Sequence, residues 1–452
     1  MNIFMLGWEF PPFISGGLGT ACYGLTKAMS ELGHHVIFVL PQPIAGTVST
    51  HVTLKTPTAQ QALAAYRSYT LREFQNVEFR AIPSTLQPYV SPDPRTEAVI
   101  TGGSEIMVQP HGGGGGAGEA ASVNVPMSIL SGPRGGFSPG QYGGDMFGEA
   151  QRYAEIAVIL ARGESFDVVH AHDWMTYPAG IAVARALGKP LVVHIHSTEF
   201  DRSGEHVNQR IYDVEREGMH AADRVIAVST LTKNIVTSRY GVPEHKVEVV
   251  YNAIDNNGNG YEALPPIGKE EKIVLFLGRI TMQKGPEYFL AAAKKVLEFN
   301  KNVRFVMAGT GDMTKRMIEL AAELGIGQKV VFTGFLRGND VARIYKMADL
   351  YVMPSVSEPF GIAPLEALSH DVPVLISKQS GVSEVLTHVL KVDFWDINEM
   401  ANKIVAVLRH PPLQATLREH GNFEIQKLTW KDSAQHCVDV YNQAIAARKG
   451  AA

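Results

Sequence analysis

The sequence predicts an α/β protein made of two doubly wound domains. The chain has 452 residues, more than one hydrophobic core usually holds. Short β-branched or aromatic runs alternate with stretches of helical periodicity, as at Ile3 to Leu6, Val36 to Leu40 and Leu191 to Ile195. This alternation is typical of βαβ units in a parallel sheet. It stops in a stretch rich in Asn, Gly and Pro at 255–266 and then restarts, which predicts an interdomain linker.

These patterns set the expected boundaries. We expect a first domain over residues 1–254, a second over 255–428, and a final helix over 429–452 whose apolar residues recur at helical spacing. Residues from about 92 to 144, which include Gly112 to Gly116, lack periodicity and are interpreted as a long surface insertion. The carboxyl ends of both sheets are expected to face a central cleft, where open α/β sheets bind ligands.

Composition excludes several classes of function. The formal net charge is −4, from 41 basic and 45 acidic residues, and no basic stripe follows the chain, so we expect no nucleic-acid partner. No run of about 20 apolar residues and no signal-peptide pattern is evident. The only cysteines, Cys22 and Cys437, are typical of a reducing compartment, so we expect a cytoplasmic protein.

The segment from Ser357 to Ala367 carries the most informative motif. It follows an apolar strand pattern and leads through Gly361 into a helix, whose first amides could meet a phosphate. Glu358 and Glu366 could accept hydrogen bonds from sugar and ribose hydroxyls. For either residue taken alone, an N-terminal cap or a solvated helix carboxylate is the favoured interpretation.

A second candidate segment follows the first expected strand of the second domain. Gly278 to Gly285 contains Arg279 and Lys284. The planar guanidinium of arginine and the compact ammonium of lysine both suit a diphosphate that gains negative charge as it leaves. Because surface cations are common, this segment alone is weak evidence.

A third glycine-rich segment lies near the N-terminus. Gly16, Gly17, Leu18 and Gly19 precede a predicted helix and could line a phosphate, but Cys22 stands where a dinucleotide fingerprint needs glycine. A nicotinamide-linked oxidoreductase is therefore disfavoured.

Histidines alternate at two predicted strand ends. His170 and His172 end one strand, and His194 and His196 end the next. They could bind metal, transfer a proton or donate to a sugar oxygen, or they could be structural. No cysteine accompanies them, and we expect no metal site.

Together these segments resemble the retaining GT-B glycosyltransferases of family 4 and the glycogen and starch synthases. The resemblance covers nearly the whole chain and includes His196 to Phe200, which is similar to archaeal-type glycogen synthases. Ser15 departs from bacterial glycogen synthases, in which lysine commonly precedes the Gly-Gly-Leu-Gly loop, so the donor base stays open.

The resemblance implies roles for individual residues. Arg279 and Lys284 would bind the donor diphosphate, Glu358 the transferred sugar and Glu366 the ribose, while His172 would contact the sugar near its reacting carbon. The resemblance further implies amide contacts with the donor from Gly17, Leu18, Gly19, Gly361, Ile362 and Ala363.

The resemblance also implies a reaction. It is a retaining, metal-independent transfer of a hexosyl group, glucosyl in our interpretation, from a nucleotide-diphosphate sugar such as ADP-glucose or UDP-glucose to an α-glucan, without a cofactor. The final helix would cross back to the first domain. A small-molecule or lipid acceptor, a nucleotide-sugar epimerase and a sugar-binding scaffold are the alternatives. The oligomeric state stays open.

Overall fold

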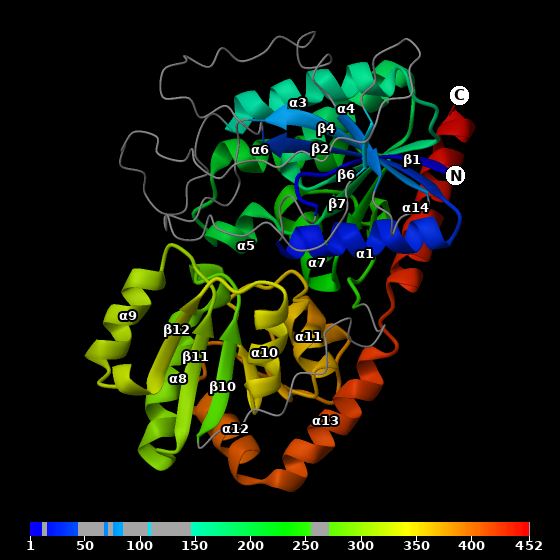
Figure 1. The fold of residues 1–452 in the computed structure, drawn as a ribbon. Helices are drawn as coiled ribbons and strands as arrows, with labels where there is room; N and C mark the ends of the chain where they lie inside the picture. The colour runs from blue at the N-terminus through cyan, green and yellow to red at the C-terminus, as the bar shows by residue number, and fades with distance from the viewer. Residues whose placement is uncertain are drawn as a thin grey trace. The chain divides into compact units, whose positions relative to one another are not determined.

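A computed structural model describes most of the chain (Figure 1). The described residues are 1–10, 16–43, 67–70, 76–84, 107–109, 146–254 and 271–451. They divide into two compact units: unit 1 comprises Met1–Val193, Ala221–Asp223 and Tyr441–Ala452, and unit 2 comprises His194–His220 and Arg224–Val440. The expected linker at 255–266 lies outside the described residues, and the expected boundaries after residues 254 and 428 stay predictions.

The first sheet contains nine strands within the described ranges, in the order β5-β3-β4-β2-β1-β6-β7-β8-β9. β1 pairs in parallel with β2 and β6, and β2 pairs in parallel with β4. β3 runs antiparallel to β4 and β5. The strands are β1 Asn2–Leu6, β2 His35–Pro43, β3 Arg67–Thr70, β4 Val77–Ser84, β5 Met107–Gln109, β6 Val168–His172, β7 Leu191–Ile195, β8 Arg224–Ala227 and β9 Val247–Val249.

The expected insertion contributes to this sheet. β5 lies within the 92–144 segment and pairs with β3, so part of that segment is a strand, which its irregular sequence did not predict. The rest of the segment, including Gly112 to Gly116, lies outside the described residues.

Helices follow the strands as the alternation predicts. In unit 1 they are α1 Gly17–Glu31, α3 Met146–Ala161, the short η2 Trp174–Thr176 and α4 Tyr177–Leu187; α3 and α4 lie side by side. In unit 2 the helices that precede the second sheet are α5 Glu199–Ser203, α6 Gln209–Ala221, α7 Thr230–Tyr240 and η3 Glu244–Lys246.

The second sheet is parallel throughout its described strands. Their order is β12-β11-β10-β13-β14-β15, and β10, β11 and β12 run side by side in Figure 1. The strands are β10 Lys272–Leu277, β11 Val303–Ala308, β12 Val330–Gly334, β13 Leu350–Met353, β14 Val374–Ser377 and β15 Leu390–Val392. The helices are α8 Pro286–Phe299, α9 Thr314–Glu323, α10 Asn339–Met347, α11 Ala363–Ser369, α12 Ile397–Arg409, α13 Pro411–Ile425 and α14 Trp430–Ala451, and the short turns are η4 Met282–Lys284, η5 Gly327–Lys329 and η6 Gly381–Glu384.

Residues of β10 alternate between two cores. Val274 and Phe276 belong to the core that contains residues of α8 and α12. Ile273 and Leu275 belong to the core that contains residues of α10 and α11. Side chains two residues apart share a face of a strand, and each large apolar side chain buried this way contributes about 1.5–3 kcal/mol. Helices therefore cover both faces of the sheet, as the doubly wound prediction required.

The C-terminal helix joins the two units, as expected. α14 begins in unit 2, but its residues from Tyr441 onward belong to unit 1. There Arg448 Nε lies 3.1 Å from Asp223 Oδ1. This confirms the predicted return of the final helix to the first domain.

Among the helices in the described ranges, none is both long enough and apolar enough to cross a membrane.

Candidate functional site

Two loops at the carboxyl edge of the second sheet bring a cation and a carboxylate together. Lys284 follows β10 and Glu358 follows β13, and these strands are parallel neighbours. Lys284 Nζ forms an ion pair with Glu358 Oε2, which also accepts a hydrogen bond from Ser355 Oγ at 3.2 Å. Glu358 is buried, whereas Lys284 is about one-quarter exposed. The structure therefore pairs two residues that the sequence assigned to different parts of a donor.

Backbone contacts hold these loops in place. Val356 N donates to Gln283 O at 2.9 Å, Glu358 N donates to Gln379 O at 3.0 Å, and Gly381 N donates to Glu358 O at 2.9 Å. Gln379 and Gly381 follow β14. Three loops that leave adjacent strands are thus joined, and Glu358 lies at the centre of this arrangement.

Gly285 is required where the loop after β10 enters α8. Its φ is +62°, and a Cβ added there would lie 2.2 Å from Pro354 O. A side chain would therefore meet the backbone that leads to Glu358. Gly285, which the sequence predicted as the end of the loop that carries Arg279 and Lys284, is therefore needed for packing. Arg279 in the same loop is exposed.

The start of α11 agrees with the helix that the motif predicts. Gly361 has φ +103°, Ile362 is the N-cap residue, and Ala363 is the first residue of the helix. Glu366 lies in the first turn, where its carboxylate accepts a hydrogen bond from Tyr345 Oη at 3.0 Å. Tyr345 comes from α10, and no motif in the sequence identified it.

The environment of Glu366 disfavours its charged form. Burial, the largest influence, raises the pKa of Glu366 above its ordinary value, although the Tyr345 hydrogen bond and nearby His370 act in the opposite direction. A desolvated carboxylate is costly unless it accepts hydrogen bonds, and Tyr345 supplies one.

Unit 1 holds the other predicted residues. His172 is the last residue of β6 and is fully buried. Asp173, which follows it, has φ +57°, an uncommon value for a residue other than glycine. Thr176 restrains this turn, because its Oγ1 donates to His172 O at 2.8 Å and its N–H donates to Asp173 O at 3.0 Å. Backbone strain of this kind concentrates at functional sites.

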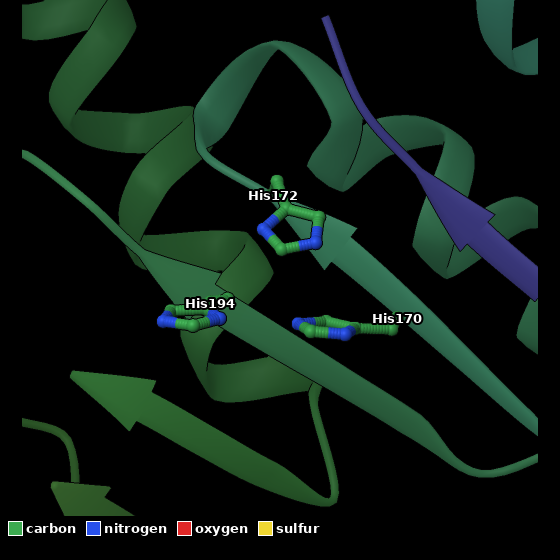
Figure 2. Close-up of side chains that lie close together, drawn as sticks. All are labelled: His170, His172 and His194. Atoms are coloured by element: carbon green, nitrogen blue, oxygen red, sulfur yellow. The ribbon is translucent and has the colours of Figure 1, made fainter. Parts of the chain in front are cut away.

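Three of the four histidines form a buried cluster on adjacent strands (Figure 2). One ring nitrogen from each of His170, His172 and His194 lies within 4.8 Å of the others. With zinc–nitrogen bonds of about 2.0–2.1 Å, two ligands of one ion lie at most about 4.2 Å apart. The expectation of no metal site stays a prediction.

The carboxylate of Glu9 lies at the N-terminus of α1, where the sequence predicted a phosphate. Its Oε2 accepts a hydrogen bond from Gly19 N at 3.2 Å, and the side chain is buried. Carboxylates stabilise helix N-termini for the same electrostatic reason as phosphates do. No motif in the sequence indicated Glu9. The donor contacts of Gly17, Leu18 and Gly19 stay predictions, and Ser15 lies outside the described residues.

The His196 to Phe200 segment leads into α5, which has a capping box. Thr198 is its N-cap residue, and Asp201 Oδ2 accepts a hydrogen bond from Thr198 N at 2.7 Å. The other oxygen, Oδ1 of Asp201, accepts one from Ser357 Oγ at 2.5 Å. Asp201 thus contacts the residue beside Glu358, a long-range pairing that no local pattern in the sequence indicated.

Family models match consecutive parts of the chain. Residues 2–96 match the starch synthase catalytic domain, residues 135–257 match glycosyltransferase family 4, and residues 263–422 match the group 1 glycosyl transferases. The chain is a group 1, family 4 glycosyltransferase. The resemblance inferred from the sequence motifs is therefore confirmed.

Individual relatives extend this assignment over the full length. The glycosyltransferase is 29% identical to the uncharacterized glycosyltransferase MJ1607 of Methanocaldococcus jannaschii, over 98% of this chain and 99% of that one. It is 25% identical to a glycogen synthase of Mycobacterium tuberculosis, over 100% and 96% of the two chains. It is 28% identical to D-inositol 3-phosphate glycosyltransferase 1 of Catenulispora acidiphila, over 65% and 76%.

The fold also matches solved structures. The sucrose-phosphate synthase of Thermosynechococcus elongatus superposes with a TM-score of 0.68 at 19% identity, and the match covers 99% of each chain. This likeness confirms the predicted GT-B fold class of the glycosyltransferase.

The contact between Gly285 and Pro354 predicts the effect of one substitution. Gly285→Ala should destabilise the glycosyltransferase more than Gly325→Ala does. Both glycines have φ above +60°, but a Cβ added at Gly325 would lie in open space. The left-handed conformation costs either alanine about 1 kcal/mol, and the clash at position 285 should add about 1 kcal/mol or more. Urea unfolding measures both; equal losses would contradict the packing role of Gly285.

The raised pKa of Glu366 predicts a pH-dependent stability difference. At a pH below the ordinary glutamate value, the carboxyl is protonated in both folded and unfolded chains and costs nothing. As the pH rises through the raised pKa, the wild type should lose stability relative to Glu366→Gln, whose amide does not titrate. Unfolding free energies measured from pH 4 to 8 test this sign. A stability difference that does not change with pH would contradict it.

Proposed function

We propose that this glycosyltransferase transfers a glucosyl group from a nucleotide-diphosphate glucose to an α-glucan with retention of configuration. The observation that carries the proposal is the joining of the loops of Lys284 and Glu358 at the carboxyl edge of a parallel sheet. Arg279 lies in the same loop as Lys284. Two cations and a buried carboxylate at such an edge suit a charged, hydroxyl-rich donor.

The proposed mechanism is mainly electrostatic. Arg279 and Lys284 stabilise the negative charge that develops on the diphosphate as the bond to the sugar breaks. Glu358 accepts hydrogen bonds from hydroxyls of the transferred sugar, and Glu366 accepts them from the ribose. His172 contacts the sugar near its reacting carbon. The acceptor hydroxyl attacks the reacting carbon from the face that the phosphate leaves, and the leaving phosphate takes up the hydroxyl proton. Because the new bond forms on the same face as the broken one, the configuration is preserved.

The proposal of a glucan acceptor is supported by the full-length similarity to a glycogen synthase. The partial similarity to an inositol phosphate glycosyltransferase favours a small phosphorylated acceptor as the second candidate. A screen of purified protein against ADP-, UDP- and GDP-glucose, each with glycogen or with inositol phosphate, separates the two. Nucleotide release and chain lengthening with glycogen support the first, whereas an isomerised donor with no transfer would indicate an epimerase and contradict both.

The electrostatic mechanism predicts large losses for two variants. Arg279→Ala and Glu358→Gln should each lower the rate of nucleotide release on the order of a hundredfold or more, because each removes charge or hydrogen bonding directed at the donor. Arg316→Ala is a matched control, since Arg316 is exposed and pairs with Glu323 on α9. Rates for the first two variants that equal that of the control would contradict the assigned roles.

The proposal also predicts that no divalent metal is required. Treatment with a chelator, followed by assay in metal-free buffer, should leave the transfer rate unchanged because the two cationic side chains supply the charge. Loss of activity that zinc restores and magnesium does not would instead implicate the histidine cluster as a metal site.

A further inference from the structure

α14 carries a buried tyrosine to the histidines of unit 1. Tyr441 is completely buried, and its Oη lies 2.6 Å from His170 Nδ1, within hydrogen-bonding distance. The two rings meet edge to face, with centroids 5.4 Å apart at an interplanar angle of 64°. Tyr441 and His170 are 271 positions apart in the sequence, so this contact exists only because the final helix returns to unit 1.

His170 in turn packs against His172. The two residues are two positions apart on β6, so their side chains lie on the same face of the strand. Their ring centroids are 4.2 Å apart at 35°, and both side chains are fully buried. Figure 2 shows the two labelled rings. A ring in such a close-packed setting can turn only if its neighbour moves.

The backbone at His172 is fixed separately. Thr176 binds the carbonyl of His172 and the strained turn at Asp173. With the backbone held, the remaining freedom of His172 is rotation of its ring. His170 is one neighbour that packs against this ring, and the ring of His170 is itself hydrogen-bonded to Tyr441.

We propose that Tyr441 and His170 are positioning residues for His172. The hydrogen bond fixes the ring orientation of His170, and the packed His170 ring then holds the imidazole of His172 in one orientation. The C-terminal helix thereby contributes to turnover without contacting the donor. This inference rests on the proposed contact of His172 with the donor sugar.

A double-mutant cycle tests the coupling. Tyr441→Phe removes the hydroxyl and keeps the ring; it should lower kcat roughly tenfold, since a small misplacement of a reacting group is costly, with little change in donor KM. In a His172→Ala background the same substitution should change kcat less than twofold, because the residue that it positions is gone. An equal effect in both backgrounds would overturn the inference.

The control is another buried tyrosine of unit 1. Tyr153 Oη donates to Val39 O at 2.8 Å, so Tyr153→Phe also deletes a buried hydrogen bond but leaves the histidines intact. It should lower stability to a similar extent and leave kcat unchanged. If it lowers kcat as much as Tyr441→Phe does, the effect of Tyr441 is a general loss of stability and the inference fails.

A spectroscopic measurement keeps the inference separate from the proposed function. Ring ¹⁵N chemical shifts of the histidines in the resting protein report tautomer and environment without any turnover. Tyr441→Phe should shift the signals of both His170 and His172, each assigned by its absence in the corresponding Asn variant. An unchanged His172 signal overturns the positioning role, even if transfer is demonstrated; a shifted signal supports positioning, even if the donor or acceptor proves to be different.

Discussion

A parallel sheet covered by helices on both faces leaves little room for polar side chains except at the strand ends. In the second sheet both faces of β10 are packed, with Val274 and Phe276 in one core and Ile273 and Leu275 in the other. Charged groups are excluded from such cores unless they are paired. This constraint places the cationic loop and Glu358 together at the carboxyl edge, and the other features of the candidate site depend on it.

The ion pair at that edge has both a structural and a chemical consequence. A buried carboxylate is stable only with partners, and Glu358 has Lys284 and Ser355. In the proposed function Lys284 binds the diphosphate and Glu358 binds the sugar. The ion pair between these two residues must therefore separate when the donor binds. A diphosphate can replace the carboxylate as partner of the lysine, while sugar hydroxyls replace the lysine as partner of the carboxylate.

Local sequence patterns predicted much of this fold and little of its side-chain pairing. Alternation located β1, β2 and β7, and the motif at Gly361 located the start of α11. β5 lies in a segment whose sequence shows no periodicity, so alternation did not locate it. The contacts of Glu9 with Gly19, Tyr345 with Glu366 and Tyr441 with His170 leave no periodic trace, because they depend on where elements meet in three dimensions.

The histidines show why charge and positioning fall to different residues. The sequence predicted them at strand ends, and His170, His172 and His194 are fully buried there. Burial lowers the pKa of neighbouring His196 to about 3, so its ring is neutral near pH 7. A neutral ring can donate or accept one hydrogen bond but cannot neutralise a leaving diphosphate. The proposed mechanism gives that charge to Lys284 and Arg279, and it gives His172 a geometric task that depends on the packing around it.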